Sequence, residues 1–279
     1  MTTQLRNYEG RLVLITGGSS GIGLALARLL AGEGARVWLL ARHKEKLEAA
    51  VASLPTPKGQ THGYVTADVT SWDRVHAAIR RIHEGPGVPD VLINAAGASH
   101  PAYLKDTSLD IFRGMMELNY FGTVHMVQAA LPAMVERGSG YIVNFASMAA
   151  FLAVFGYAAY TPSKSAVRGF SDSLRLELKP AGIRISVVFP PDTDTAGMAE
   201  ENKTKPWETI EAFSTKLESA EDVARRVLRG MKQGRYVILP GFEANLYYRL
   251  VYLLGDGIYP ILDMLLSQAR SKKSKLQGG

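Results

Sequence analysis

Tyr160 and Lys164 stand four residues apart in the segment YTPSK, and Ser147 lies thirteen residues before Tyr160. If this segment is helical, Tyr160 and Lys164 share one face of the helix. An ammonium beside a phenol favours the phenolate and lowers a tyrosine pKa that starts near 10. Such a tyrosine can exchange a proton with a carbonyl or alcohol oxygen, and Ser147 can donate a hydrogen bond to the same oxygen. These three residues therefore predict acid–base chemistry at a carbonyl or alcohol group.

A glycine-rich turn, TGGSSGIG at residues 16–23, follows a short apolar run and opens a helical pattern. Glycines let the backbone turn sharply and approach a pyrophosphate, while the helix N-terminus offers N–H donors. The G-x3-G-x-G spacing differs from G-x-G-x-x-G, yet the strand–turn–helix context is that of a dinucleotide site. Such turns also occur for packing alone. As a phosphate site, the turn would contact the cofactor through Gly17, Ser19, Ser20, Gly21, Ile22 and Gly23.

Arg42 ends the second predicted strand, at a position where an NAD site usually carries an acid for the ribose 2′-hydroxyl. A guanidinium binds a 2′-phosphate bidentately, whereas a carboxylate would repel it. This position favours NADPH, with Lys46 assisting, although an ordinary surface arginine is the alternative. Asp68 and Val69 end the third strand and are placed to meet the adenine. The run after the fourth strand would pass beside the cofactor's ribose: Asn94, Ala95 and Gly97.

Short apolar runs alternate with helical patterns along the chain, which is typical of βαβ units around a buried parallel sheet. The apolar runs predict strands at 11–17, 35–42, 63–69, 91–97, 140–147, 183–190 and 235–240. Helical patterns cover 21–34, 44–54, about 70–84, 108–137 and 157–179. With no internal repeat and no linker, we predict an α/β fold with a Rossmann-like, doubly wound parallel sheet in a single domain.

The composition excludes several classes of protein. The 279 residues are 47% apolar and 21% charged and contain no cysteine, which excludes a disulfide framework, a thiolate zinc site and a cysteine nucleophile. The six histidines show no metal-ligand spacing, so we expect no metal. The net charge of +6 includes +4 in the last ten residues, and the balanced remainder argues against a nucleic-acid partner. The first ten residues are polar, so we expect a cytoplasmic protein.

Together these motifs resemble the classical short-chain dehydrogenase/reductase family over about residues 10–240. The resemblance rests on TGGSSGIG, INAAG (93–97), Asn119, Ser147 and YTPSK (160–164), in the family's order. It implies that Tyr160 is the acid/base and that Ser147 orients the carbonyl. It also implies that Lys164 binds the nicotinamide ribose and lowers the pKa of Tyr160, and that Asn119 holds a water in the proton relay.

The segment after the sixth strand departs from the family's usual Pro-Gly, because Pro190 is followed by Pro191. Proline there changes how the backbone can meet the nicotinamide amide. The run PPDTDTAGMAEENKTKP, residues 190–206, resembles that of 3-ketodihydrosphingosine reductases, which use NADPH to reduce the ketone of a long-chain amino alcohol in sphingolipid synthesis. That resemblance implies a substrate loop over 190–218 and a lipid-like ketone substrate, with cofactor contacts from Pro190, Thr193 and Thr195.

Two alternatives remain open at this point. One is a reductase of another substrate, such as a 3-oxoacyl thioester or a steroid-like ketone, which shares the same lid loop. The other is a protein that binds NADPH as a sensor or a membrane scaffold without catalysis. The intact acid–base set favours an enzyme.

The carboxyl-terminal segment is apolar, with 15 apolar residues among the 22 at 245–266. This length could span a bilayer, but each charge at the centre costs about 2.5–3.5 kcal/mol, and the segment carries Arg249, Asp256 and Asp263. Two glycines and a proline predict two short helices. Packing on the domain, shallow membrane association and a dimer contact remain open, and the basic tail is either a membrane contact or a frayed, solvated end. We expect a reductase domain over 1–243, an appendage over 244–279, and a homo-oligomer.

Overall fold

Seven parallel strands form the central sheet of the computed structural model, which describes residues 7–213 and 217–277. The strand order is β3-β2-β1-β4-β5-β6-β9. Their bounds are β1 (Leu12–Thr16), β2 (Arg36–Ala41), β3 (Gly63–Thr66), β4 (Val91–Asn94), β5 (Gly140–Phe145), β6 (Ile183–Val188) and β9 (Val237–Ile238). The order reverses between β1 and β4, which is the switch point where open α/β sheets bind ligands. The predicted Rossmann-like fold and its seven strands are confirmed.

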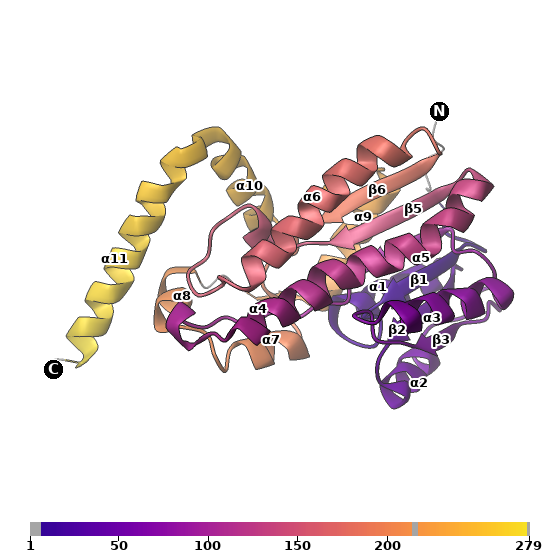
Figure 1. The fold of residues 1–279 in the computed structure, drawn as a ribbon, viewed down its shortest axis with the longest axis horizontal. Coiled ribbons are helices and arrows are strands. Elements are labelled where there is room, and N and C mark those ends of the chain that lie inside the picture. The colour runs from indigo at the N-terminus through magenta and orange to yellow at the C-terminus, as the bar shows by residue number, and fades with distance from the viewer. Residues whose placement is uncertain (1–6, 214–216, 278–279) are drawn as a thin grey trace.

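Helices cover both faces of this sheet (Figure 1). Alternate residues of β1 point to opposite faces. Val13 and Ile15 pack with α1 (Gly21–Gly32) and α9 (Ala220–Lys232), whereas Leu12 and Leu14 pack with the helices of the other face. Those helices are α3 (Trp72–Glu84), α5 (Gly122–Arg137) and α6 (Tyr160–Leu178). The helix α2 (Lys44–Ala52) follows β2. The sequence analysis did not predict α9, although its apolar residues recur at helical spacing.

The predicted helix at 108–137 has three parts. These are α4 (Leu109–Met115), a π-helical turn (Met116–Phe121) and α5. A π-helical turn often marks a functional site, and this one contains Asn119.

The predicted loop over 190–218 is largely structured. The strand β7 (Thr193–Asp194) pairs in parallel with β8 (Glu218–Ser219), and α7 (Ala196–Glu201) and α8 (Trp207–Phe213) lie between them. Residues 214–216 of this predicted loop lie outside the described residues. The pairing of β7 with β8 brings the two ends of the loop together.

The carboxyl-terminal segment forms α10 (Phe242–Leu254), a 3-10 turn (Gly255–Gly257) and α11 (Ile258–Gln277), at the left of Figure 1. Two short helices were predicted here, but the second helix, α11, is not short, because it has 20 residues. Pro260 lies in the first turn of α11, where backbone N–H groups have no intrahelical partner, so it does not end the helix. The basic tail, for which a frayed end was one of the alternatives, is helical as far as Gln277, and Lys272 Nζ lies 2.6 Å from Glu211 of α8.

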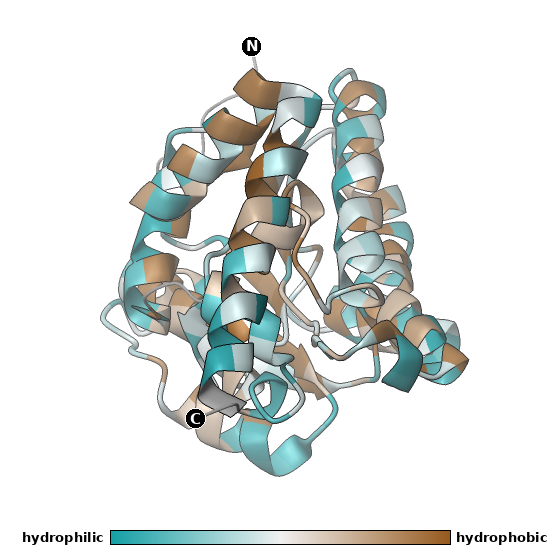
Figure 2. Cartoon of the chain, turned by 90° about the vertical axis from the view of Figure 1, so that its left-hand side faces the viewer, coloured by the Kyte–Doolittle hydropathy of each residue, from teal (hydrophilic) through white to brown (hydrophobic). Residues whose placement is uncertain are grey.

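By length and composition alone, the helical stretch Phe242–Lys275 could cross a membrane. Of its apolar 18-residue segment, 6% is buried inside the protein. Figure 2 shows α11 facing the viewer, with apolar residues in its first turns and polar residues toward its end.

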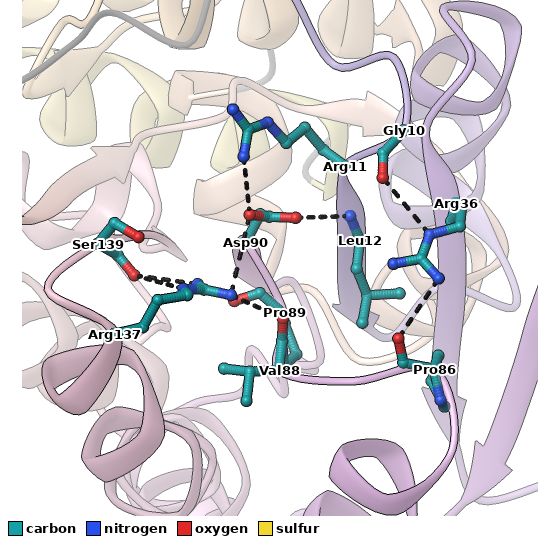
Figure 3. A network of polar contacts seen from close by, with 10 residues as sticks. All are labelled: Gly10, Arg11, Leu12, Arg36, Pro86, Val88, Pro89, Asp90, Arg137 and Ser139. Atoms are coloured by element: carbon teal, nitrogen blue, oxygen red, sulfur yellow. Dashed lines mark hydrogen bonds and ion pairs between the residues drawn. The ribbon is translucent and has the colours of Figure 1, made fainter.

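A polar network joins the elements at the amino edge of the sheet, opposite the ligand-binding edge (Figure 3). The Asp90 carboxylate accepts hydrogen bonds from Leu12 N at 2.9 Å and from Arg11 Nη1 at 3.1 Å. Arg137, at the end of α5, lies 3.8 Å from Asp90 and donates to Val88 O and Pro89 O at 2.8 and 2.7 Å. Asp90 therefore ties β1 and α5 to the start of β4.

Candidate active site

A cavity of about 670 Å³ lies where β1, β4, β5 and β6 end. Its walls come from the glycine turn, from the residues after these strands, and from α7, α8, α10 and α11. The predicted site residues that border it are Gly17, Ser20, Gly21, Ile22, Gly23, Ala95, Gly97, Ser147, Tyr160, Lys164, Pro190, Thr193 and Thr195. The structure thus brings the glycine turn and the proposed acid–base residues to one space.

Ser147, Tyr160 and Lys164 meet at the polar end of this cavity. Ser147 follows β5 and caps a 3-10 turn (Met148–Ala150), and it is close enough to Tyr160 to lower the pKa of the phenol. Tyr160 begins α6, and Lys164 lies one turn later with Nζ 5.9 Å from the centre of the Tyr160 ring. Lys164 is 5% exposed and donates a hydrogen bond from Nζ to Phe145 O at 2.9 Å.

The electrostatics of Tyr160 differ from the sequence-based expectation. Burial raises the pKa of Tyr160, the hydrogen bond with Ser147 lowers it, and the Glu201 and Asp192 carboxylates raise it further. The net effect is that the pKa of Tyr160 is raised. The predicted lowering of this pKa by Lys164 is not found. The reason lies in burial, which also lowers the pKa of Lys164 to about 8.

Asn119 is fully buried in the π-helical turn, next to this group. Its Nδ2 donates to Ser163 Oγ at 2.9 Å and to Ala98 O at 3.0 Å, and its Oδ1 accepts from Ala98 N at 3.1 Å. A Cβ placed on Gly97 would lie 2.7 Å from Asn119 Oδ1 and 3.1 Å from Lys164 Nζ. Gly97 therefore lets the backbone pass close to both side chains, as a ligand-binding segment requires.

The glycine turn has the geometry of a phosphate cradle. Gly17 and Gly21 have φ angles of 67° and 53°, which glycine adopts without strain. A Cβ on Gly17 would lie 2.8 Å from Ala96 N, and one on Gly23 would lie 2.5 Å from Gly17 O. In the described part of the chain, the Ser20 side chain makes no cap hydrogen bond at the start of α1. The first N–H groups of this helix are therefore suited to bind an anion.

Thr195, at the start of α7, lies across from the turn. A Cβ on Gly21 would come 3.1 Å from Thr195 Cγ2. The Thr195 hydroxyl accepts from Met198 N at 3.2 Å and so caps α7. The loop after β6 therefore passes close to the glycine turn, and Pro190 and Thr193 of this loop also border the cavity.

The remaining predicted cofactor residues lie away from the described cavity lining. Arg42 and Lys46 are exposed, at the end of β2 and on α2, and Ser19 lies in the glycine turn. Burial raises the pKa of Asp68, but hydrogen bonds from Thr70 and the charges of Arg42 and Arg74 hold it below its ordinary value. Arg42 and Asp68 therefore lie close together. The sequence analysis did not single out the neighbouring Arg74.

Two predicted residues point into the protein interior. Asn94 is buried, and its Nδ2 donates to Asn144 Oδ1 of the adjacent strand at 2.9 Å. Val69 packs in the core on the face that carries α5. Any contact of Asn94 or Val69 with a cofactor would therefore use the backbone.

A buried polar group in the cavity was missed by the sequence analysis. Glu201, at the end of α7, accepts hydrogen bonds from the Tyr157 and Ser99 hydroxyls, and Lys205 Nζ lies 3.1 Å from Glu201 Oε1. All four side chains border the cavity, with Glu201 and Lys205 only 11% and 7% exposed. No pattern in the sequence separates Glu201 from the adjacent Glu200, which is 72% exposed.

The far end of the cavity is apolar. Its wall is formed by side chains of α8, α10 and α11, among them Phe213, Tyr247, Leu250, Leu254, Ile258 and Leu262. The cavity thus has a polar end that contains Tyr160 and an apolar end that can accommodate a hydrocarbon chain.

Residues 11–206, more than half of the chain, match the sequence profile described as short chain dehydrogenase. The chain belongs to the short-chain dehydrogenase/reductase family. Two solved structures are similar to most of this chain. The Sphingobium yanoikuyae enzyme in complex with NADPH has 27% identity and a TM-score of 0.76, with 90% of this chain and 95% of that chain covered. A levodione reductase has 26% identity and a TM-score of 0.77, with 86% and 99% covered.

Curated relatives are more similar to this chain in sequence. The 3-dehydrosphinganine reductase of Danio rerio is 39% identical over 82% of this chain and 70% of the relative. The 3-ketodihydrosphingosine reductase of Dictyostelium discoideum is 38% identical over 93% of this chain and 83% of the relative.

Proposed function

We propose that this protein is an NADPH-dependent reductase that converts 3-ketodihydrosphingosine to dihydrosphingosine in sphingolipid synthesis. The observation that carries this proposal is the two-ended cavity, in which Ser147 and Tyr160 occupy the polar end and α8, α10 and α11 form an apolar wall. A long-chain amino ketone matches both ends. The names of the relatives at 38–39% identity support the same substrate.

The proposed cofactor would lie along the carboxyl edge of the sheet. The glycine turn fits its pyrophosphate, because Cβ atoms at Gly17 and Gly23 would collide with the backbone and the α1 N-terminus points there. We propose that Arg42 and Lys46 bind the 2′-phosphate, since both are exposed cations, Arg42 directly after β2 and Lys46 in the first turn of α2. Lys164 would bind the nicotinamide ribose. When bound, NADPH supplies the hydride for the carbonyl carbon.

The chain's own residues would handle the proton. Ser147 donates a hydrogen bond to the substrate's carbonyl oxygen, and Tyr160 donates its phenolic proton to that oxygen as the alcohol forms. Ser147 and Tyr160 both border the cavity, and Ser147 is close enough to act on the pKa of the Tyr160 phenol, which supports a shared role at one oxygen. Lys164 stabilises the resulting phenolate, and Asn119, beside Lys164 behind Gly97, holds the water through which Tyr160 regains a proton.

Purified protein should oxidise NADPH when 3-ketodihydrosphingosine is added, and Tyr160→Phe should abolish this turnover while NADPH binding is retained. The matched control is Tyr259→Phe, an exposed tyrosine on α11. Turnover of a 3-oxoacyl thioester without turnover of 3-ketodihydrosphingosine would assign a different substrate. Full activity of Tyr160→Phe would remove the proposed acid.

We also propose that α10 and α11 lie at the surface of a membrane. Phe242 and Leu253 are 78% and 82% exposed, and the same two helices line the apolar end of the cavity. An apolar helix face with basic residues nearby is typical of an interfacial helix. A substrate with a long hydrocarbon chain could then pass from the lipid to the cavity beside these helices.

Flotation with anionic phospholipid vesicles tests this placement. Replacing both Phe242 and Leu253 by Ser should release the protein from the vesicles. Leu176→Ser, at a 72% exposed leucine of α6, should not. The wild type could instead fail to bind vesicles and be a dimer in light scattering. If the Phe242/Leu253 double variant is then a monomer, the surface serves self-association.

A further inference from the structure

Glu201 has capacity for one more hydrogen-bond donor. Its Oε1 accepts from Tyr157 and lies 3.1 Å from Lys205 Nζ, whereas its Oε2 accepts from Ser99. An ionised carboxylate offers about four lone-pair positions. Among the described residues these three donors leave one position on Oε2. Because Glu201 borders the cavity, a bound ligand can supply the fourth donor.

Glu201 also lies close to the proposed acid. Tyr157, which donates its hydroxyl proton to Glu201, has its ring centre 5.8 Å from that of Tyr160. The Glu201 charge is close enough to act on the ionisation of the Tyr160 phenol. A carboxylate therefore stands beside the point where the substrate's carbonyl oxygen would bind.

The proposed substrate has an ammonium on the carbon next to its carbonyl. When the carbonyl oxygen contacts Tyr160 and Ser147, this ammonium must lie within the same polar end of the cavity. Resting on the function proposed above, we infer that Glu201 binds the substrate's ammonium and so selects amino ketones over neutral ketones. Glu201 is then a specificity-determining residue of this reductase.

The charge balance supports this role. An ammonium moved from water into a buried site is destabilised unless a hydrogen-bonded opposite charge is present. Glu201 is 11% exposed and already held by three donors, so it can bind the ammonium without rearranging. The substrate's ammonium would act together with Lys205 in offsetting the carboxylate charge next to Tyr160. It would thereby stabilise the phenolate that remains after Tyr160 has given up its proton.

The test compares two substrates in two variants. Glu201→Gln keeps the shape and removes the charge. Glu84→Gln is the matched control, because Glu84, at the end of α3, is 69% exposed, pairs with Arg80 at 3.9 Å and is not among the residues that border the cavity. The substrates are 3-ketodihydrosphingosine and the analogue in which hydrogen replaces the amino group.

Glu201→Gln should lower kcat/KM for the amino ketone about 10- to 100-fold, the range of a charge-assisted hydrogen bond. The value for the neutral analogue should stay within about twofold, and Glu84→Gln should change neither value.

Equal losses with the two substrates would overturn the inference, because they would make Glu201 only a support for Tyr157 and the loop. A wild type that reduces both substrates equally well would also overturn it. A calorimetric comparison of dihydrosphingosine with the long-chain alcohol that lacks the amino group separates this inference from the proposed function. If the wild type binds dihydrosphingosine more tightly than the alcohol without the amino group, and Glu201→Gln binds both equally, the ammonium site is supported even without turnover. The absence of any preference refutes the site.

Discussion

Lys164 donates a hydrogen bond from Nζ to the backbone carbonyl oxygen of Phe145, 2.9 Å away. This bond joins the first turns of α6 to the end of β5, next to Ser147. The ammonium has been moved out of water, since Lys164 is 5% exposed. Burial accordingly lowers its pKa to about 8 from an ordinary value of 10.5. Placing a cation here therefore reduces the stability of the fold in order to serve the site.

The first prediction is that Lys164→Met raises the free energy of unfolding at pH 7 while abolishing activity. The expected gain is about 1–3 kcal/mol, because a buried charge is exchanged for an apolar side chain of similar length. Between pH 8 and 10.5 the unfolded state binds a proton that the folded state does not, so wild-type stability rises with pH across this window. Urea unfolding at pH 7 and pH 10.5 should show the gap closing. A variant that is less stable than the wild type at pH 7 would contradict this account.

The second prediction concerns the pH dependence of turnover. We expect kcat/KM to fall as the pH rises through about 8, because Lys164 then loses the charge that stabilises the Tyr160 phenolate. Tyr160 itself keeps its proton in this range, since burial raises its pKa. The measurement is a pH profile of wild type and Lys164→Arg. Arginine stays charged, so its profile should have a lower plateau and no fall near pH 8. The same falling limb in both proteins would assign it to another group.

The third prediction concerns the choice of cofactor. Replacing Arg42 by Ala should raise KM for NADPH about 10- to 100-fold, because a charge-assisted contact with the 2′-phosphate is lost. The constants for NADH should hardly change. Arg80→Ala is the control, since Arg80 is an exposed arginine on α3 that pairs only weakly with Glu84 at 3.9 Å. If both cofactors weaken by similar factors, Arg42 stacks on the adenine and does not select the phosphate.

The fold was predictable because buried parallel strands appear as continuous apolar runs, as at Val91–Asn94, where all four residues are buried. The glycine turn was predictable because Gly17 and Gly23 are positions at which a Cβ would collide with the backbone. The proximity of Ser147 to Tyr160 was anticipated because Ser147 ends a predicted strand and stands thirteen residues before Tyr160 in the order of the family motifs. These features depend on local residue type and on spacing.

Glu201 could not be predicted because its environment is tertiary. Glu200 and Glu201 are adjacent carboxylates, yet one is exposed and paired with Lys203 while the other is buried against Tyr157 and Ser99, which lie far away in the sequence. The extension of α11 through Pro260 was missed because a proline usually ends a helix, and only its position in the first turn makes it harmless. The raised pKa of Tyr160 was missed because burial is not visible in a motif.

The last prediction separates stability from catalysis. Asp90 accepts from Leu12 N and Arg11 Nη1 and lies 3.8 Å from Arg137, at the edge of the sheet opposite the cavity (Figure 3). Asp90→Ala removes the acceptor from a backbone N–H and from two guanidinium groups. It should lower the free energy of unfolding by about 1–3 kcal/mol, the range for a partly buried, charge-assisted acceptor. Asp110→Ala, at a 90% exposed aspartate paired only with Arg113 three residues on, should change stability by less than about 0.5 kcal/mol. Because the network does not touch the cavity, kcat/KM of the folded Asp90→Ala protein should equal that of the wild type. A large loss of activity below its unfolding temperature would mean that the two edges of the sheet are coupled.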